Sequence, residues 1–213
     1  MLELGVKITL AYALGAIMGG LIVGYARGGV DIRKIGSGNV GGTNALRTQG
    51  KLFAFFVMLI DVGKGILAVA FLPLIDLPGI GIDAEIDRDL MTYAVGLAAV
   101  VGHVFPVWVD FRGGKGGATA AGLLAYVAPT VALPVIGAWL AVVFFTGYVG
   151  IATVSAAWLA AVYVAIARLP EQRALFAFAV LLAAFITYTH RSNLRRMWDG
   201  TESRFGRFFG LIK

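Results

Sequence analysis

Residues 116–167 read GGATAAGLLAYVAPTVALPVIGAWLAVVFFTGYVGIATVSAAWLAAVYVAIA, and none of these side chains is charged. A helix needs about 20 mostly apolar residues to cross the hydrocarbon core of a bilayer. One or two helices would leave too much apolar chain over, so we divide the run into three. We expect the breaks near 129–134, where two prolines occur, and near 146–150. The stretch therefore predicts an integral membrane protein.

The composition of the whole chain agrees with this. Of 213 residues, 59% are hydrophobic and 14% are charged, whereas a soluble domain carries roughly a quarter charged residues. There is no cysteine, which excludes disulfides, thiolate catalysis and cysteine metal sites. The two histidines, His103 and His190, are far apart in sequence and disfavour a transition-metal site. We therefore expect neither a metal nor another cofactor.

Four further apolar stretches, residues 8–25, 52–72, 90–109 and 174–189, bring the expected number of spans to seven. The start, MLELGVK, carries one acid and one base ahead of an uncharged run. This is typical of a retained first span and not of a cleaved signal peptide. No internal repeat is visible, so residues 1–213 are expected to form a single all-α bundle.

Basic residues indicate which way the bundle is oriented. The loop from Arg27 to Lys51 has five basic side chains against Asp31, and the loop 75–89 is acidic. The turn 111–119 and the tail from Arg191 are basic again. Basic loops face the cytoplasm, which places the N-terminus outside and, with seven spans, the C-terminus in the cytoplasm. The net charge of +6 is thus explained by membrane topology, and we expect no nucleic-acid partner.

Three polar segments fall on the predicted cytoplasmic side: GSGNVGGTNALR (36–47), FRGGKGGAT (111–119) and THRSNLRR (189–196). Consecutive glycines free backbone N–H groups to converge on an anion, and a helix that starts just downstream strengthens such a nest. Lys115 adds a full charge. The alternative is a tight glycine turn with a lysine that follows the positive-inside rule. A P-loop is excluded because Lys115 is followed by glycine and not by serine or threonine.

The first polar segment offers small hydrogen-bonding side chains and Arg47, which suit hydroxyl groups and phosphate oxygens. A flexible polar loop is the alternative. In the third segment, His190 and Asn193 share one face if the helix continues, and a histidine there is a candidate general base or hydrogen-bond donor. An interfacial histidine flanked by snorkelling arginines is the alternative.

Asp61 and Lys64 lie inside the second span, where charges indicate function by default. Their mutual pairing at i, i+3 is a sufficient structural explanation. His103 stands near Pro106, so a helix-end hydrogen bond and a catalytic role are both open. Two classes of function fit: a membrane enzyme for anionic substrates, and an anion transporter or channel. A transporter favours polar groups near the midplane, so polar groups gathered at one face favour the enzyme, while the charged second span keeps the alternative open.

Taken together, GSGNVGGTN with Arg47, GHVFPVWVDFRGGKGGAT and HRSNLRR followed by GTES resemble the three signature motifs of one family. It is that of the bacterial acyl-phosphate-dependent glycerol-3-phosphate acyltransferases, the PlsY family. DVGK at 61–64 resembles the family's second span, and the motifs follow in order along the whole chain. Gly42, where alanine is more usual, and Gly117, where valine is expected, are small departures.

The resemblance implies transfer of a fatty acyl group from acyl phosphate to the sn-1 hydroxyl of glycerol 3-phosphate. The products are lysophosphatidate and inorganic phosphate, the first step of phospholipid synthesis. It also implies a multi-pass protein of the bacterial cytoplasmic (inner) membrane with its active site at the cytoplasmic face, in contact with membrane lipid. Docking of a soluble acyl-phosphate-producing enzyme and the oligomeric state stay open. The H-x₄-D signature of another acyltransferase class is missing, because Trp108 and Arg195 stand five residues after the two histidines.

An acyl phosphate is a mixed anhydride with a good leaving group, so the acceptor hydroxyl can attack it without an enzyme nucleophile. The expected catalytic residues are Ser37, Arg47, Lys115, His190 and Asn193. The expected substrate- and phosphate-binding residues are Gly36, Gly38, Asn39, Thr43, Asn44, Lys64, His103, Gly113, Gly114, Gly116, Gly117 and Thr119. Asp61 is expected to be structural, as is Glu202, which we expect to brace the tail by pairing with an arginine.

Overall fold

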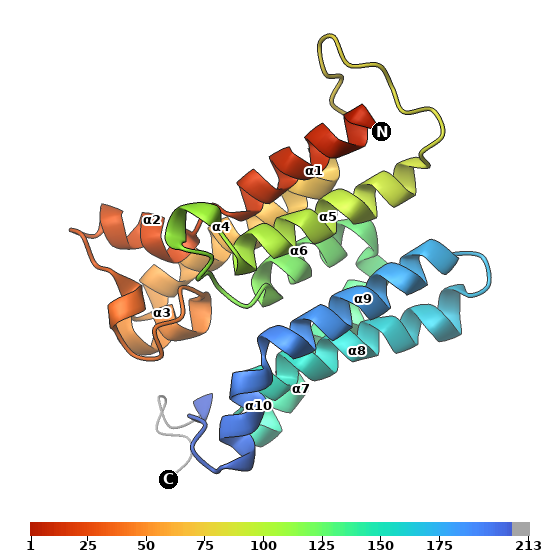
Figure 1. Cartoon of the computed structure of the whole chain (residues 1–213). Coiled ribbons are helices and arrows are strands. Elements are labelled where there is room, and N and C mark those ends of the chain that lie inside the picture. The colour runs from red at the N-terminus through yellow and green to blue at the C-terminus, as the bar shows by residue number, and fades with distance from the viewer. Residues whose placement is uncertain (206–213) are drawn as a thin grey trace. The chain divides into compact units, whose positions relative to one another are not determined.

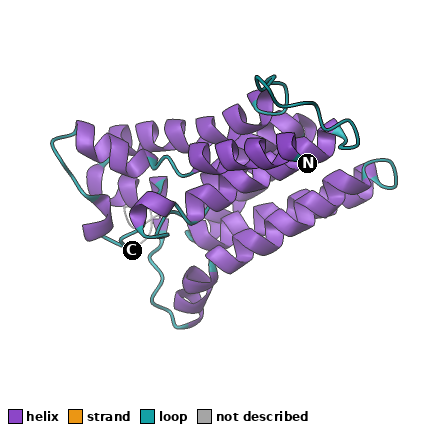
Figure 2. Cartoon of the chain, turned by 45° about the horizontal axis from the view of Figure 1, so that its top comes forward, coloured by secondary structure: helices purple, strands orange, loops and turns teal. Residues whose placement is uncertain are grey.

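The computed structural model describes residues 1–205, and every one of them is helical or in a loop (Figure 2). The absence of strands from this part of the chain confirms the predicted all-α class. The chain forms two compact units, residues 1–127 and the residues from Ala128 on. Arg207 and Lys213 of the predicted basic tail lie outside the described residues.

The first unit holds six α-helices and two short 3-10 helices, coloured red to green in Figure 1. In this unit α1 packs along α5, and α4 packs along both α6 and α3. The elements are α1 (Leu2–Gly15), α2 (Gly19–Ala26), η1 (Ile32–Lys34), α3 (Gly42–Gln49), α4 (Lys51–Phe71), α5 (Arg88–Val104), η2 (Val107–Val109) and α6 (Gly117–Val127).

Glycines let the helices of this unit approach closely. A Cβ atom on Gly65 of α4 would overlap the carbonyl oxygen of Thr119 in α6, and one on Gly122 of α6 would overlap that of Val62 in α4. Small residues at helix contacts are typical of membrane proteins, where close van der Waals packing drives association. This contact fixes the first turn of α6, which follows the glycine turn directly.

The first span is bent by 43° between α1 and α2. The helix begins at Leu2, whereas the sequence predicted a start at residue 8. The difference arises because α1 includes two charged residues, Glu3 and Lys7, whose side chains are buried in the protein. Lys7 Nζ donates to Glu3 Oε1 at 2.8 Å and to the carbonyl oxygen of Pro73 at 2.9 Å. Arg88 adds a third partner, 2.8 Å from Glu3. Paired charges of this kind can be buried where isolated ones cannot. A prediction based on the uncharged run alone therefore placed the start of the helix too late in the sequence.

The second unit consists of α7 (Pro129–Thr146), α8 (Val149–Arg168), α9 (Arg173–Thr189) and α10 (Arg191–Trp198), with α8 packed against α7 and α9 (Figure 1). Both predicted breaks are confirmed. Pro129 opens α7, where a missing N–H costs nothing, and Gly147 ends it with a left-handed φ of 74°. Between α9 and α10 the chain bends by 55° at His190, so the helix does not continue straight through the third motif.

Four helices are long and apolar enough to cross a membrane, or six if each bent pair forms one span. They include α7 and α8, which expose large apolar side chains such as Phe144, Phe145 and Ile166, each about four-fifths exposed (78%, 81% and 81%). Exposed apolar faces of this extent suit contact with lipid. The fourth predicted span corresponds to α6, which has only 11 residues, because the glycine turn extends to residue 116 and the next helix begins at Pro129. Seven spans, and the sides on which the termini lie, stay predictions.

Candidate active site

The loop before α3 is shaped by the buried side chain of Asn44. Its amide nitrogen donates to the carbonyl oxygens of Ile32 at 3.3 Å, Ile35 at 3.0 Å and Asn39 at 2.9 Å, and its Oδ1 accepts from the Ser37 N–H at 3.0 Å. All four contacts are to the backbone. Asn44, which the sequence placed among the substrate-binding residues, therefore fixes the loop in this structure.

Glycines make this loop possible. Gly36 and Gly38 have left-handed φ angles of 61° and 72°, which side chains rarely adopt. A Cβ atom on Gly36 would also overlap Oδ1 of Asn44. Ser37 lies between the two glycines and is exposed, and Asn39 Oδ1 closes a turn by accepting from the Gly41 N–H at 2.9 Å. The loop thus presents the Ser37 hydroxyl on a fixed backbone.

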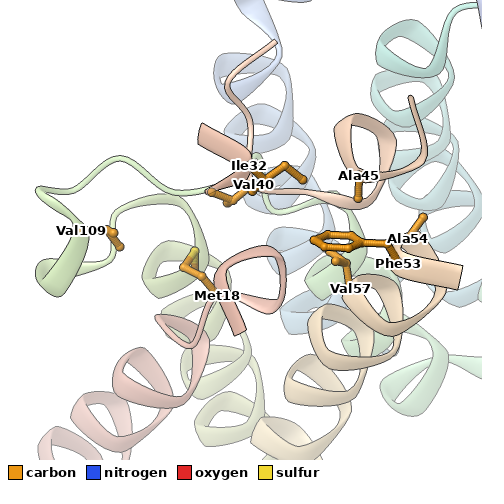
Figure 3. Packing of buried hydrophobic residues seen from close by; sticks show 8 residues of the cluster. All are labelled: Met18, Ile32, Val40, Ala45, Phe53, Ala54, Val57 and Val109. Atoms are coloured by element: carbon orange, nitrogen blue, oxygen red, sulfur yellow. The ribbon is translucent and has the colours of Figure 1, made fainter. Parts of the chain in front are cut away.

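An apolar cluster holds the loop and α3 in place (Figure 3). Ile32, Val40 and Ala45, from η1, the loop and α3, pack with the residues of α4 and with Met18 and Val109. Arg47 and Thr43 are partly buried on α3. The cluster consists of Met18, Ile32, Val40, Ala45, Phe53, Ala54, Val57 and Val109. The loop with Ser37 and the helix with Arg47 are therefore held together by the same apolar cluster of the first unit.

Asp31 begins the same segment. It caps η1 by accepting from the Arg33 N–H at 3.1 Å and from the Arg33 guanidinium at 2.9 Å. These hydrogen bonds hold the pKa of the Asp31 carboxyl below its usual value. The carboxylate therefore stays ionised and balances one cation of this basic loop.

The glycine turn begins with strained backbone. Asp110 and Phe111 have left-handed φ angles of 53° and 57°, and such outliers in non-glycine residues gather at functional sites. The chain then folds back, so that the N–H groups of Gly113 and Gly114 donate to the carbonyl oxygens of Val104 and His103, each at 3.0 Å. These two N–H groups are used inside the protein and do not join an anion nest.

The remaining part of the turn leads straight into α6. Gly116 has a φ of 83°, and its carbonyl oxygen accepts the first helical hydrogen bond, from Ala120 at 2.8 Å. Lys115 is partly buried beside it, and Thr119 in the first turn is fully buried. Thr119 Oγ1 has no hydrogen-bond partner among residues 1–205. The helix start at Gly117 matches the sequence-based prediction, and it places the partial positive charge of a helix N-terminus next to Lys115.

Asp61 and Lys64 form the predicted pair, with Lys64 Nζ 3.0 Å from Asp61 Oδ1. His103 joins them, with its Nδ1 2.7 Å from Lys64 Nζ and 3.6 Å from Asp61 Oδ1. All three side chains are buried. This connection was not predicted from the sequence because it joins two helices through residues 39 positions apart. The available signal was the position of His103, which lies at the end of a span and shortly before the glycine turn.

The third motif belongs to the second unit. His190 stands at the bend between α9 and α10, and its Nδ1 lies 2.8 Å from the carbonyl oxygen of Ile186. A carbonyl oxygen only accepts, so Nδ1 carries the hydrogen and, in the neutral ring, Nε2 has the lone pair. His190 is buried together with Asn193. His190 and Asn193 were expected to share a helix face only if the helix continued, and this condition is not met because His190 lies between α9 and α10.

Asn193 and Arg196 converge on Glu202. Asn193 Nδ2 donates to Glu202 Oε1 at 2.7 Å, and Arg196 Nε donates to Oε2 at 2.7 Å. The predicted pairing of Glu202 with an arginine is present. Gly150 in α8 leaves room for this arrangement, since a Cβ atom there would lie 2.8 Å from that of Asn193. The role of Gly150 was not predicted, because it depends on α10 packing against α8.

Comparison with known proteins matches this chain along almost its whole length. The sequence model of a family described as "Glycerol-3-phosphate acyltransferase" matches residues 6–200. A glycerol-3-phosphate acyltransferase of Chlorobium phaeobacteroides (strain DSM 266 / SMG 266 / 2430) is 37% identical, over 97% of this chain and 99% of that protein. One of Aquifex aeolicus (strain VF5) is 39% identical, over 93% and 97%.

Two solved structures are similar as well. Both are crystal structures of PlsY (YgiH), described as an integral membrane glycerol 3-phosphate acyltransferase. The glycerol 3-phosphate form has a TM-score of 0.82 at 36% identity and covers 99% of each chain. The lysophosphatidic acid form has a TM-score of 0.79 at 36% identity and covers 95% of each chain.

Proposed function

The chain belongs to the glycerol-3-phosphate acyltransferase family and is a multi-pass membrane enzyme of the PlsY type, and from this premise we propose its donor and mechanism. We propose that it moves a fatty acyl group from acyl phosphate to the sn-1 hydroxyl of glycerol 3-phosphate. The observation that carries the proposal is Lys115 beside the N-terminus of α6, because a cation next to the positive end of a helix suits a phosphate group.

The transfer is a single substitution at the acyl carbon. The glycerol oxygen bonds to the carbonyl carbon, the bond from that carbon to the phosphate oxygen breaks, and inorganic phosphate leaves. The proton of the hydroxyl passes to a base. No residue is acylated on the way, which suits a chain without cysteine. The enzyme then has to align two anionic head groups and stabilise the charge that develops on the carbonyl and the leaving phosphate.

Two cationic sites meet this need. Lys115 and the N–H groups of the first turn of α6 bind one phosphate, and the buried hydroxyl of Thr119 lies in the same turn. Arg47 binds the other phosphate together with Ser37, whose position between Gly36 and Gly38 is set by Asn44. Separate cations offset the mutual repulsion of the two phosphates.

His190 and Asn193 orient the glycerol hydroxyl, and we assign the role of general base to His190. Because Nδ1 carries its hydrogen toward the Ile186 carbonyl oxygen, Nε2 is the nitrogen that we assign to take the proton of the hydroxyl. The phosphate of the substrate is the competing base. Glu202 touches no substrate in this mechanism and holds Asn193 and Arg196.

We place the site at the cytoplasmic face of the bacterial inner membrane, because the loops that carry it are basic. The acyl chain then lies against membrane lipid. A soluble acyl-phosphate-producing enzyme that docks on this basic face would deliver the donor directly.

A donor comparison tests the proposal. The purified protein is given glycerol 3-phosphate and, in parallel, an acyl phosphate, an acyl-CoA and an acyl-carrier protein, without added metal. We expect lysophosphatidate only with the acyl phosphate. Turnover with acyl-CoA alone would keep the family and overturn the donor, and silence with every donor would contradict the assignment and favour the transporter.

A further inference from the structure

Lys64 has no hydrogen left for a substrate. An ammonium group has three N–H donors, and Lys64 Nζ lies 3.0 Å from Asp61 Oδ1, 2.7 Å from His103 Nδ1 and 2.6 Å from the carbonyl oxygen of Ile17. Lys64 is 3% exposed, and its two side-chain partners are as buried. This differs from the expectation that Lys64 and His103 contact phosphate, and it raises the question of what a buried ion pair contributes.

On one side the pair caps the break in the first span. Lys64 contacts the Ile17 carbonyl just after α1, and Asp61 Oδ1 accepts from the N–H of Gly19, the first residue of α2, at 3.3 Å. The cation thus meets the negative end of one helix and the anion the positive end of the next. Trp108 helps by donating to the Ala16 carbonyl at 2.8 Å. Backbone groups freed by a break within a span need such partners.

On the other side the network touches the glycine turn. Lys64 donates to Nδ1 of His103, so in the neutral imidazole Nε2 carries the hydrogen. This edge of the ring lies against Gly114, where an added Cβ atom would overlap Nε2. The same histidine accepts the Gly114 N–H through its carbonyl oxygen at 3.0 Å. The ring and the backbone of His103 therefore both fix where the turn runs.

We propose that Asp61, Lys64 and His103 are positioning residues that anchor the turn 113–116 to the break in the first span. They touch no substrate, and they act on phosphate binding only through the backbone of the turn and Lys115. The proposal rests on the proposed function in one respect, that the turn binds a phosphate group. In this proposal the charged residues inside the membrane span support phosphate binding without contacting the phosphate.

The test uses the full-length protein in detergent and two readouts that need no turnover. Hydrogen exchange of the peptide that covers 113–116 reports the order of the turn, and titration with inorganic phosphate reports its affinity. The first network variant is His103→Asn, which keeps an acceptor near Lys64 but removes the ring edge. The second is the double variant Asp61→Asn/Lys64→Gln, which removes both charges so that none is left unpaired. Val100→Ala, also buried in α5, is the control for general destabilisation.

We expect both network variants to exchange faster at 113–116 and to bind phosphate at least about tenfold more weakly, while Val100→Ala changes neither. A double variant tests the contact itself. In Gly114→Ala the added methyl group collides with the His103 ring, so phosphate affinity should fall. Adding His103→Ser removes the ring and should restore part of this affinity, so that the two effects do not add.

Unchanged exchange at 113–116 in both network variants would overturn the proposal, as would unchanged phosphate affinity. If the wild-type protein binds no phosphate but the network variants still loosen the turn, then the phosphate site is wrong and the positioning role stands.

Discussion

The side-chain amide of Asn193 donates to Glu202 at 2.7 Å, and both residues are buried beyond the bend at His190. Arg196 occupies the other oxygen of the same carboxylate. The carboxylate therefore ties α10 to the segment that follows it. Because Asn193 is two residues into α10, the direction of its side chain depends on this tie.

Glu202→Ala should lower kcat by about 10- to 100-fold, since a small misplacement of an orienting group is costly. Arg196→Ala should cost much less, because it leaves the bond between Asn193 and Glu202 intact. Steady-state kinetics of the two variants, with their thermal unfolding, check this. Equal losses in both would show that the ion pair between Arg196 and Glu202 matters and the hydrogen bond between Asn193 and Glu202 does not.

Lys115→Ala should lower kcat/KM by about 10²–10³-fold, the usual loss when one preorganised donor is removed from developing charge. Its melting temperature should stay close to that of the wild type, because Lys115 is only partly buried. Lys34→Ala removes an exposed cation of η1 and is the matched control, with unchanged activity. Near-normal turnover of Lys115→Ala would refute phosphate binding at the turn.

His190→Gln should lower kcat by about 10²–10⁴-fold, the range for loss of a general base. His190→Asn keeps a donor for the Ile186 carbonyl but also lacks the basic nitrogen, so it should be as inactive and better folded. In both variants the rise of activity with pH that reports deprotonation of His190 should disappear. If the pH–rate profile keeps its shape while activity only falls, the substrate phosphate is the base.

Asn44→Ala should lower the free energy of unfolding by about 2–4 kcal/mol, because it leaves several backbone groups of the loop without their partner. It should also raise KM for glycerol 3-phosphate, as the loop that carries Ser37 loses its shape. Asn44→Asp keeps the acceptor for the Ser37 N–H and loses the donors, so its free energy of unfolding and its KM should lie between those of the wild type and Asn44→Ala. Wild-type kinetics in Asn44→Ala would mean that the loop holds its shape by other contacts.

Much of this arrangement could be predicted because its signals are local. Uncharged runs predicted the helices, Pro129 and Gly147 marked the breaks, and a spacing of three residues predicted the pair of Asp61 and Lys64. Glu202 followed from its place in a basic tail. In each case the deciding residues lie close together in the sequence, within one apolar run, one turn of helix or one short loop.

The rest depends on contacts between distant segments. His103 reaches Lys64 only because α5 packs near α4. The bend at His190 has neither proline nor glycine to announce it. The break after α1 lacks a proline too, although the glycines at 15, 19 and 20 were a usable signal. A polar side chain in a glycine-rich loop suggests a ligand, which is why Asn44 was assigned to substrate binding, and its hydrogen bonds to the backbone of the loop could not be predicted from the sequence.

Direct transfer without an acyl-enzyme can be tested by measuring phosphate release during the first turnover. The enzyme is mixed rapidly with an acyl phosphate, with and without glycerol 3-phosphate, at enzyme concentrations high enough to detect one equivalent. We expect no phosphate release without the acceptor and, with it, phosphate and lysophosphatidate formed together in equal amounts. A burst of one equivalent of phosphate in the absence of glycerol 3-phosphate would contradict direct transfer.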